Sequence, residues 1–188
     1  MRFAFMRSVG CVATVVWMLS ACASQAVNSW VKPGALKPVE CLAVSYSFGP
    51  FTSAPANSQA EALATYMEQQ VGPLLQYNAI PFCGLQRASQ GKPAPGKASH
   101  LLRLTSKSGE FNYQAQSTSF NVDFELVELA SNEVVFRGAT YGWVQPRYGV
   151  SKMLSRSMNS MNDVGLVAIP GGRLKYAVPE QVGNVITD

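Results

Sequence analysis

The side chains with the most distinctive chemistry in this chain are its four cysteines and its single histidine, His100. A thiol can carry a covalent lipid, form a disulfide or bind a metal, and its surroundings decide between these fates. Cys11 and Cys22 lie near the amino terminus, whereas Cys41 and Cys83 lie in the body of the chain. Two cysteines and one histidine are too few ligands for a four-coordinate zinc. We therefore expect no metal and no other cofactor.

The first residues have the pattern of a secretory signal. Arg2 and Arg7 form a short basic head, and the apolar stretch 8–19 that follows contains no charge. A transmembrane helix needs about 20 predominantly apolar residues, and polar sequence resumes too early for that. We therefore predict export, with residues 1–21 removed as a signal peptide.

The apolar stretch ends in Leu19-Ser20-Ala21-Cys22, which resembles the lipobox of bacterial lipoproteins. The resemblance implies cleavage before Cys22, diacylglycerol on its thiol and a further acyl chain, such as palmitate, on its new amine. Two or more chains make membrane anchoring stable. Ala23 follows, where aspartate is typical of inner-membrane retention, so we expect an outer-membrane anchor with the folded part in the periplasm. The alternative is an ordinary cleaved signal in which Cys22 is incidental.

Export would leave Cys41 and Cys83 as the only pair of thiols in an oxidising compartment, so we predict a disulfide between them. Closing a loop of roughly 43 residues would stabilise the fold by ~4 kcal/mol in the chain-entropy model. The alternatives are two free thiols or a metal site.

Patterns that could support catalysis are weak. Residues 91–97 have the spacing of a phosphate-binding loop, but Ala98 stands where a hydroxyl would hold magnesium. No Gly-x-Ser-x-Gly elbow accompanies His100, which opens a strand beside this loop. Asp123 and Glu125 point to the same face of one strand, and we interpret that face as solvated. We therefore predict that the protein is not an enzyme, with hydrolysis as the least favoured function.

A second kind of candidate site combines aromatic and arginine side chains near a strand end. Such residues are common anchors of protein interfaces. We predict a partner-binding surface here, and the alternative is that the aromatic rings pack in the core. The residues are Tyr141, Trp143, Arg147 and Tyr148.

Periodicity predicts the elements that must position these residues. A strand over 39–48 would place Leu42, Val44, Tyr46 and Phe48 on one face. A capping box at Ser58 predicts a helix that ends near Asn78, with Gly72-Pro73 kinking its last turns. The remaining predicted elements are a strand at 101–105 that residues 111–116 follow or continue, a hairpin of 120–126 and 134–144 turning at 130–132, and a helix at 152–164.

The whole chain carries 15 Lys and Arg against 11 Asp and Glu. Arg2 and Arg7 leave with the signal, so the mature part has 15 − 2 = 13 basic and 11 acidic residues, without the basic stripe that nucleic acid needs. We divide it into a flexible tether at 22–38, one domain at 39–165 and an irregular tail at 166–188 with a possible edge strand at 174–178. The expected fold is α+β, with a mixed or antiparallel sheet of about four strands and two helices on one face.

The order strand, capped helix, strand, long hairpin and Leu/Met-striped helix resembles a group of small periplasmic α/β domains. The group includes the amino-terminal domain of TolB, ABC-type transport auxiliary lipoproteins, the lipopolysaccharide-assembly lipoprotein and lipoprotein activators of penicillin-binding proteins. The resemblance implies an accessory lipoprotein, anchored in outer-membrane lipid, that docks onto an envelope protein. The alternative is a carrier for a lipid or hydrophobic small molecule, which would need an apolar cavity between sheet and helices.

Overall fold

A computed structural model describes residues 28–34, 37–88, 96–114, 117–144 and 146–175, with the backbone alone at 28, 117, 141–144 and 146–147. These residues form six strands and two helices. In chain order the elements are β1 (Asn28–Val31), β2 (Leu42–Phe48), α1 (Ala54–Tyr77), β3 (Phe82–Arg87), β4 (His100–Asn112), β5 (Ser117–Glu128), β6 (Glu133–Val144) and α2 (Pro146–Asp163).

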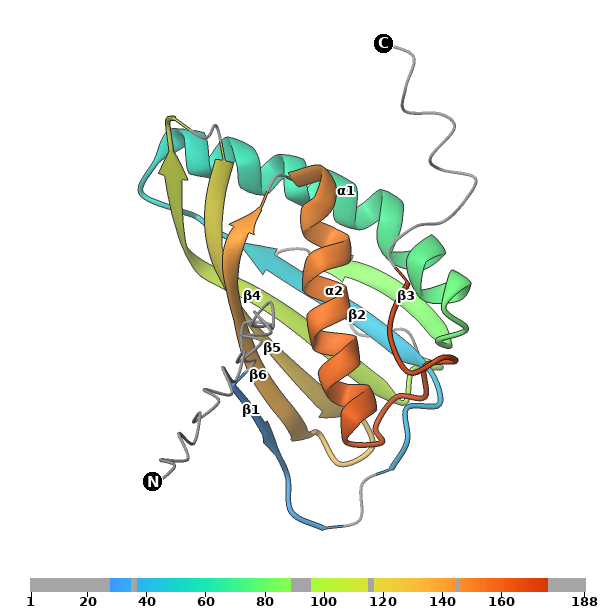
Figure 1. Ribbon diagram of the computed structural model, residues 1–188. Coiled ribbons are helices and arrows are strands. Elements are labelled where there is room, and N and C mark those ends of the chain that lie inside the picture. Colours follow the sequence, from blue (N-terminus) through green and yellow to red (C-terminus); the bar gives the residue numbers. More distant parts are fainter. Residues whose placement is uncertain (1–27, 35–36, 89–95, 115–116, 145, 176–188) are drawn as a thin grey trace, which may run out of the picture.

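The strands form one mixed sheet in the order β1-β6-β5-β4-β2-β3 (Figure 1). Antiparallel pairing joins β1, β6, β5 and β4, and parallel pairing joins β4, β2 and β3. The α+β class is as predicted, but the expected sheet of about four strands is wrong. The two additional strands are β1 and β3, and both are short segments at the sheet edges, where pairing with a distant strand decides their structure.

Strand β1 lies inside the stretch that the sequence indicated as a tether. Its four residues pair antiparallel with residues 136–139 of β6. In the segment that leads into β2, the Val39 N–H donates to the Leu166 carbonyl at 2.8 Å. The part of residues 22–38 that precedes the sheet is therefore only 22–27.

The central hairpin agrees with the predicted pattern. β5 and β6 pair across a turn in which Asn132 takes a positive φ of 55°, a conformation that asparagine tolerates well. β4 runs unbroken from His100 to Asn112, with a bulge between Ser106 and Ser108. Residues 111–116 thus continue the preceding strand as far as Asn112.

Helix α1 begins earlier than its predicted capping box. Ser53 is the N-cap, and its hydroxyl accepts the Ala56 N–H at 3.5 Å. Pro55 sits in the first turn, where its missing N–H leaves no hydrogen bond unmade. The helix passes through Pro73 and ends at the predicted place, with Asn78 as C-cap.

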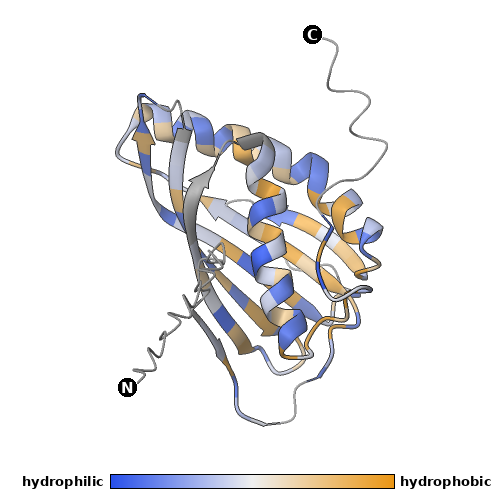
Figure 2. Ribbon diagram, in the orientation of Figure 1, coloured by the Kyte–Doolittle hydropathy of each residue, from blue (hydrophilic) through white to orange (hydrophobic). Residues whose placement is uncertain are grey.

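The core lies between the sheet and the two helices, which cover the same sheet face (Figure 1). Hydrophilic and hydrophobic residues alternate along α2, as expected for a helix with one buried side (Figure 2). Side chains with less than 2% exposure fill the layer between sheet and helices, and they include Tyr46, Leu63, Met67, Phe120, Phe124 and Phe136.

The segment after α2 has no helix or strand as far as Lys175, but it is packed. Leu166, Ile169 and Leu174 are at most 6% exposed and belong to the core. The Asn78 side chain accepts the Lys175 N–H at 2.7 Å and donates to its carbonyl at 3.1 Å. The irregular course of the predicted tail is therefore found in 166–175, but the segment seals one end of the core. Leu174 and Lys175 are not part of the edge strand expected at 174–178, and the rest of that range lies outside the described residues.

Candidate functional site

The predicted sites fall on very different parts of the structure. Cys22 lies outside the described residues, so its lipidation stays a prediction. Cys41 and Cys83 form a disulfide with a Cα–Cα distance of 5.7 Å. The disulfide joins the residue before β2 to β3, next to the parallel pair Leu42 and Phe82. It therefore holds the start of β2 against an edge strand that has a neighbour on one side only.

The predicted partner-binding residues are divided between two elements. Tyr141 and Trp143 belong to β6, whereas Arg147 and Tyr148 belong to the first turn of α2. The side chains of the first three lie outside the described residues. Tyr148 is 60% exposed, so its ring is accessible and is not part of the core.

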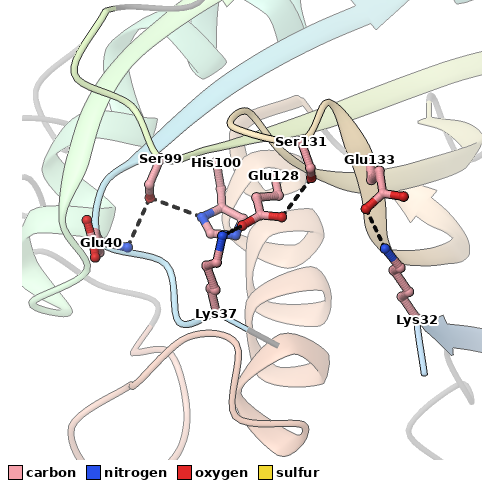
Figure 3. A network of polar contacts seen from close by, with 8 residues as sticks. All are labelled: Lys32, Lys37, Glu40, Ser99, His100, Glu128, Ser131 and Glu133. Atoms are coloured by element: carbon pink, nitrogen blue, oxygen red, sulfur yellow. Dashed lines mark hydrogen bonds and ion pairs between the residues drawn. The ribbon is translucent and has the colours of Figure 1, made fainter. Parts of the chain in front are cut away.

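His100 lies in a cluster of polar residues at the start of β4 (Figure 3). It is 2% exposed, and its Nδ1 lies 3.0 Å from Ser99 Oγ. Ser99 Oγ also accepts the backbone N–H groups of Glu40 and Cys41, both at 3.0 Å, and lies 3.2 Å from the Cys41 carbonyl oxygen. The cluster thus ties the chain entering β2 to the start of β4.

Burial favours the neutral form of His100. Burial lowers the pKa of His100, and the carboxylates of Glu128 and Glu40 only partly offset that effect. The ion pair of Lys37 with Glu128, at 2.6 Å, raises the pKa of the lysine and lowers that of the carboxyl, to which Ser131 also donates at 2.7 Å.

This geometry decides what Ser99 can do chemically. A hydroxyl oxygen has two lone pairs, and both are used by the amides of Glu40 and Cys41. A serine nucleophile needs a lone pair directed at its substrate. Ser99 is therefore held as a structural hydrogen-bonding group, although it is adjacent to a histidine.

The sheet face opposite the helices, which we call the open face, carries a row of charged side chains. The register places Trp30, Arg137, Glu125 and Arg103 side by side on β1, β6, β5 and β4. Glu125 lies 3.1 Å from Arg137 and 4.0 Å from Arg103. The Arg137 guanidinium lies 5.7 Å from the centre of the Trp30 ring, which is 46% exposed. The Arg137 guanidinium thus contacts the Trp30 ring at the sheet edge on one side and the Glu125 carboxylate on the other.

A hollow of about 520 Å³ lies beside this row. Trp30 and Arg137 form one part of its lining, and Lys107, Asp123 and Thr105 form another. Asp123 pairs with Thr105 across β5 and β4, and Lys107 occupies the bulge of β4. Within the described residues, the side chains of Lys107 and Asp123 have no hydrogen-bond or ion-pair partner.

The sequence pattern indicated Asp123 and Glu125 as a solvated strand face, and both do lie on the open face. It did not indicate Trp30, because the ring was placed in a tether, and it did not indicate Lys107. The alternation of Asn28-Ser29-Trp30-Val31 before Pro33-Gly34 was the available signal for a short edge strand. No local signal places these residues next to Asp123, because the hollow is assembled across four strands.

The described residues contain neither a metal-binding cluster nor a helix able to span a membrane. No three His, Cys, Asp or Glu side chains are grouped so that they could hold a metal ion there. Neither α1 nor α2, the helices of the described part, combines the length and apolar character needed to cross a membrane.

No family model matches the sequence, and no curated protein matches it. Several solved structures share part of the arrangement. The PelC dodecamer from Paraburkholderia phytofirmans matches with 17% identity over 68% of this chain and 88% of that chain, at a TM-score of 0.39. Lipoprotein GNA1162 from Neisseria meningitidis matches with 9% identity over 65% and 98% of the two chains, at 0.38. Protein XCC0632 from Xanthomonas campestris, of the family model DUF330, matches with 7% identity over 68% and 86%, at 0.35. With TM-scores below 0.5, these similarities assign neither a family nor a function to the chain.

Proposed function

We propose that the protein is an accessory lipoprotein, anchored to the outer membrane through acyl chains on Cys22 and acting in the periplasm by docking onto another envelope component. The observation that carries the proposal is the Leu19-Ser20-Ala21-Cys22 motif at the end of an uncharged apolar stretch. The disulfide between Cys41 and Cys83 supports an oxidising compartment.

The position of β1 supports a short connection to the membrane. Residues 23–27 separate Cys22 from Asn28, the first residue of the sheet. Six Cα–Cα steps reach at most roughly 20 Å. An anchor at Cys22 would therefore keep the β1 edge of the sheet close to the lipid surface.

The carrier alternative needs an apolar cavity between the sheet and the helices. That layer is filled by side chains, including the stacked rings of Phe124 and Phe136, whose centres are 5.9 Å apart. The hollow on the open face is lined by charged groups as well as Trp30, which does not suit a purely hydrophobic ligand. Docking is therefore the better-supported function.

A catalytic role has less support than docking. Ser99 uses its lone pairs on backbone amides, and Glu125 is engaged by Arg137 and Arg103. Asp123, another carboxylate of β5, is exposed on the open face.

The anchor is tested by Cys22→Ser, with Cys11→Ser as the matched control within the same predicted signal. We expect Cys22→Ser to abolish the lipidated amino-terminal peptide that mass spectrometry detects in the mature protein, and Cys11→Ser to leave it unchanged. An unmodified amino terminus in the unsubstituted protein would refute the anchor.

The docking partner is tested by photo-crosslinking in intact envelopes. A photoreactive residue at Tyr148 should give a discrete crosslinked species, whereas one at Tyr113, which is 69% exposed on the β4–β5 connection, should not. Equal yields from both positions would show that the crosslinks are unspecific and would contradict a partner surface at the start of α2.

A further inference from the structure

We propose that the hollow on the open face binds zwitterionic phospholipid headgroups of the membrane in which the protein is anchored, so that this face of the sheet lies against the lipid surface. The inference rests on the proposed anchor at Cys22. It adds a binding site and an orientation that the anchor by itself does not give.

The charged side chains in the hollow match a zwitterionic ligand. Lys107 and Asp123 face it with opposite charges and have no ionic or hydrogen-bond partner among the described residues. Two unpaired charges of opposite sign match a ligand that carries both an anion and a cation. Phosphatidylethanolamine has such a headgroup, with a phosphate that Lys107 can bind and an ammonium group that Asp123 can bind.

The exposed ring of Trp30 also fits a site at the membrane surface. Trp30 is 46% exposed and lies in the same lining as Lys107. An indole ring has an apolar body and a polar N–H, and tryptophan is enriched where membranes meet water. Arg137 lies against the ring, which orders the indole in part before a ligand binds.

The predicted tether also brings the anchoring membrane within reach of the hollow. Asn28 pairs with Ala139, and Ala139 pairs with Asp123. The segment that comes from the predicted anchor therefore enters the sheet in the same cross-strand row as the hollow. Strands lie about 4.8 Å apart, so the two strand spacings from Asn28 to Asp123 add roughly 10 Å to the ~20 Å reach of residues 22–28. A headgroup of the anchoring leaflet is the ligand that this tether brings to the hollow at the highest local concentration.

The experiment uses the mature acylated protein reconstituted into vesicles. The sequence has three tryptophans, Trp17, Trp30 and Trp143, and Trp17 belongs to the predicted signal. Trp143→Phe therefore makes Trp30 the only tryptophan of the mature chain. Its fluorescence is measured with a nitroxide quencher attached to the lipid headgroup, and flotation of the same vesicles reports the anchor separately.

We expect the floated protein to show strong quenching of Trp30 in phosphatidylethanolamine vesicles. The matched reporter is a chain with Trp30→Phe, Trp143→Phe and Tyr77→Trp, because Tyr77 is 42% exposed at the end of α1. We expect little quenching at that position. Equal quenching of both reporters would overturn the proposed orientation.

Two substitutions test the headgroup chemistry. Lys107→Gln should weaken binding of headgroups in the hollow, measured by quenching of Trp30, about threefold. The effect should be the same in vesicles of phosphatidylethanolamine and of phosphatidylglycerol, since a phosphate contact is lost in both. Asp123→Asn should weaken this binding only with phosphatidylethanolamine, whose ammonium group phosphatidylglycerol lacks. Lys97→Gln removes an exposed lysine outside the hollow and should change nothing. Quenching that is insensitive to Asp123→Asn would overturn the zwitterionic ligand.

The two proposals fail in different ways. Protein that does not float refutes the anchor and, with it, the headgroup site. Protein that floats with Trp30 unquenched refutes the headgroup site and leaves the anchor intact. If the Trp30 signal is unquenched by lipid but changes as protein density in the vesicle rises, a second copy of the chain covers the hollow, which also overturns the inference.

Discussion

Gly138 of β6 lies directly opposite Phe124 of β5 and has almost no space above its Cα. A Cβ at this position would lie 2.4 Å from Phe124 Cζ and 2.5 Å from Cε2. The ring is 1% exposed and stacks on Phe136, so it cannot turn into solvent to make room. Gly138→Ala therefore forces a rearrangement inside the core.

The expected loss of stability follows from two opposing effects. Overpacking a core by one methyl group lowers stability by about 1–3 kcal/mol. Replacing a strand glycine recovers about 0.5–1 kcal/mol, because alanine has less conformational freedom in the unfolded chain. The group that must move is the buried ring of Phe124, which stacks on Phe136. The overpacking cost should therefore lie near the upper end of the range of about 1–3 kcal/mol. We therefore expect a net loss of about 2 kcal/mol, or a melting temperature about 4–8 °C lower for a domain of this size.

Urea and thermal denaturation of the disulfide-bonded protein measure this effect. Phe124→Leu removes the ring edge that the new methyl group meets, so Gly138→Ala should lower stability by less than about 0.5 kcal/mol in that background, a coupling of about 1.5 kcal/mol. Gly96→Ala is the control, because a Cβ there meets nothing within 4 Å. A Gly138→Ala protein of unchanged stability, or fully additive effects with Phe124→Leu, would refute the packing of this ring over the glycine.

Three further predictions concern the base of the sheet. Cys41→Ser with Cys83→Ser opens a loop closed over a separation of 42 residues, so we expect a loss of ~4 kcal/mol in the chain-entropy model, and an unchanged urea midpoint would contradict it. Ser99→Ala leaves two backbone N–H groups without an acceptor and should lower stability by about 1–3 kcal/mol, whereas Ser53→Ala at the cap of α1 should lower it by about 1 kcal/mol; the same denaturation experiment compares them. Because burial holds the pKa of His100 below its unfolded value of about 6.5, the stability from its neutral form is present above that pH and is lost as pH falls toward the folded-state pKa. Urea midpoints between about pH 8 and 5 should therefore fall less in His100→Gln than in the unsubstituted protein, and parallel curves would count against a buried neutral histidine.

Much of the local structure could be predicted because it depends on neighbours in the sequence. The alternation in 120–126 and the turn at 130–132 specify the hairpin, since a shift by one residue would turn Phe124 and Leu126 away from the core. Asn78 ends α1 as expected. The start of α1 was predicted five residues too late, because Ser53 and Ser58 both have the chemistry of a cap and only Ser53 is used.

The candidate sites divide in the same way. The lipobox-like motif was predicted from residue types alone, and the pairing of Cys41 with Cys83, which the structure shows, from residue types and the expected compartment. The hollow could not, because Trp30, Asp123 and Lys107 are far apart in the sequence and are gathered only by strand register.

The sequence by itself predicts an export signal and a lipid-acceptor cysteine, and it determined the hairpin and the two amphipathic helices, since each depends on residues within a few turns or one strand length of one another. The tertiary structure alone decided that residues 28–31 join the sheet, that 166–175 seal the core and that Ser99 is held by backbone amides. It also decided which charges face the open side without a partner. The physical reason is that strand pairing and burial depend on contacts between distant segments, whose register no local pattern encodes.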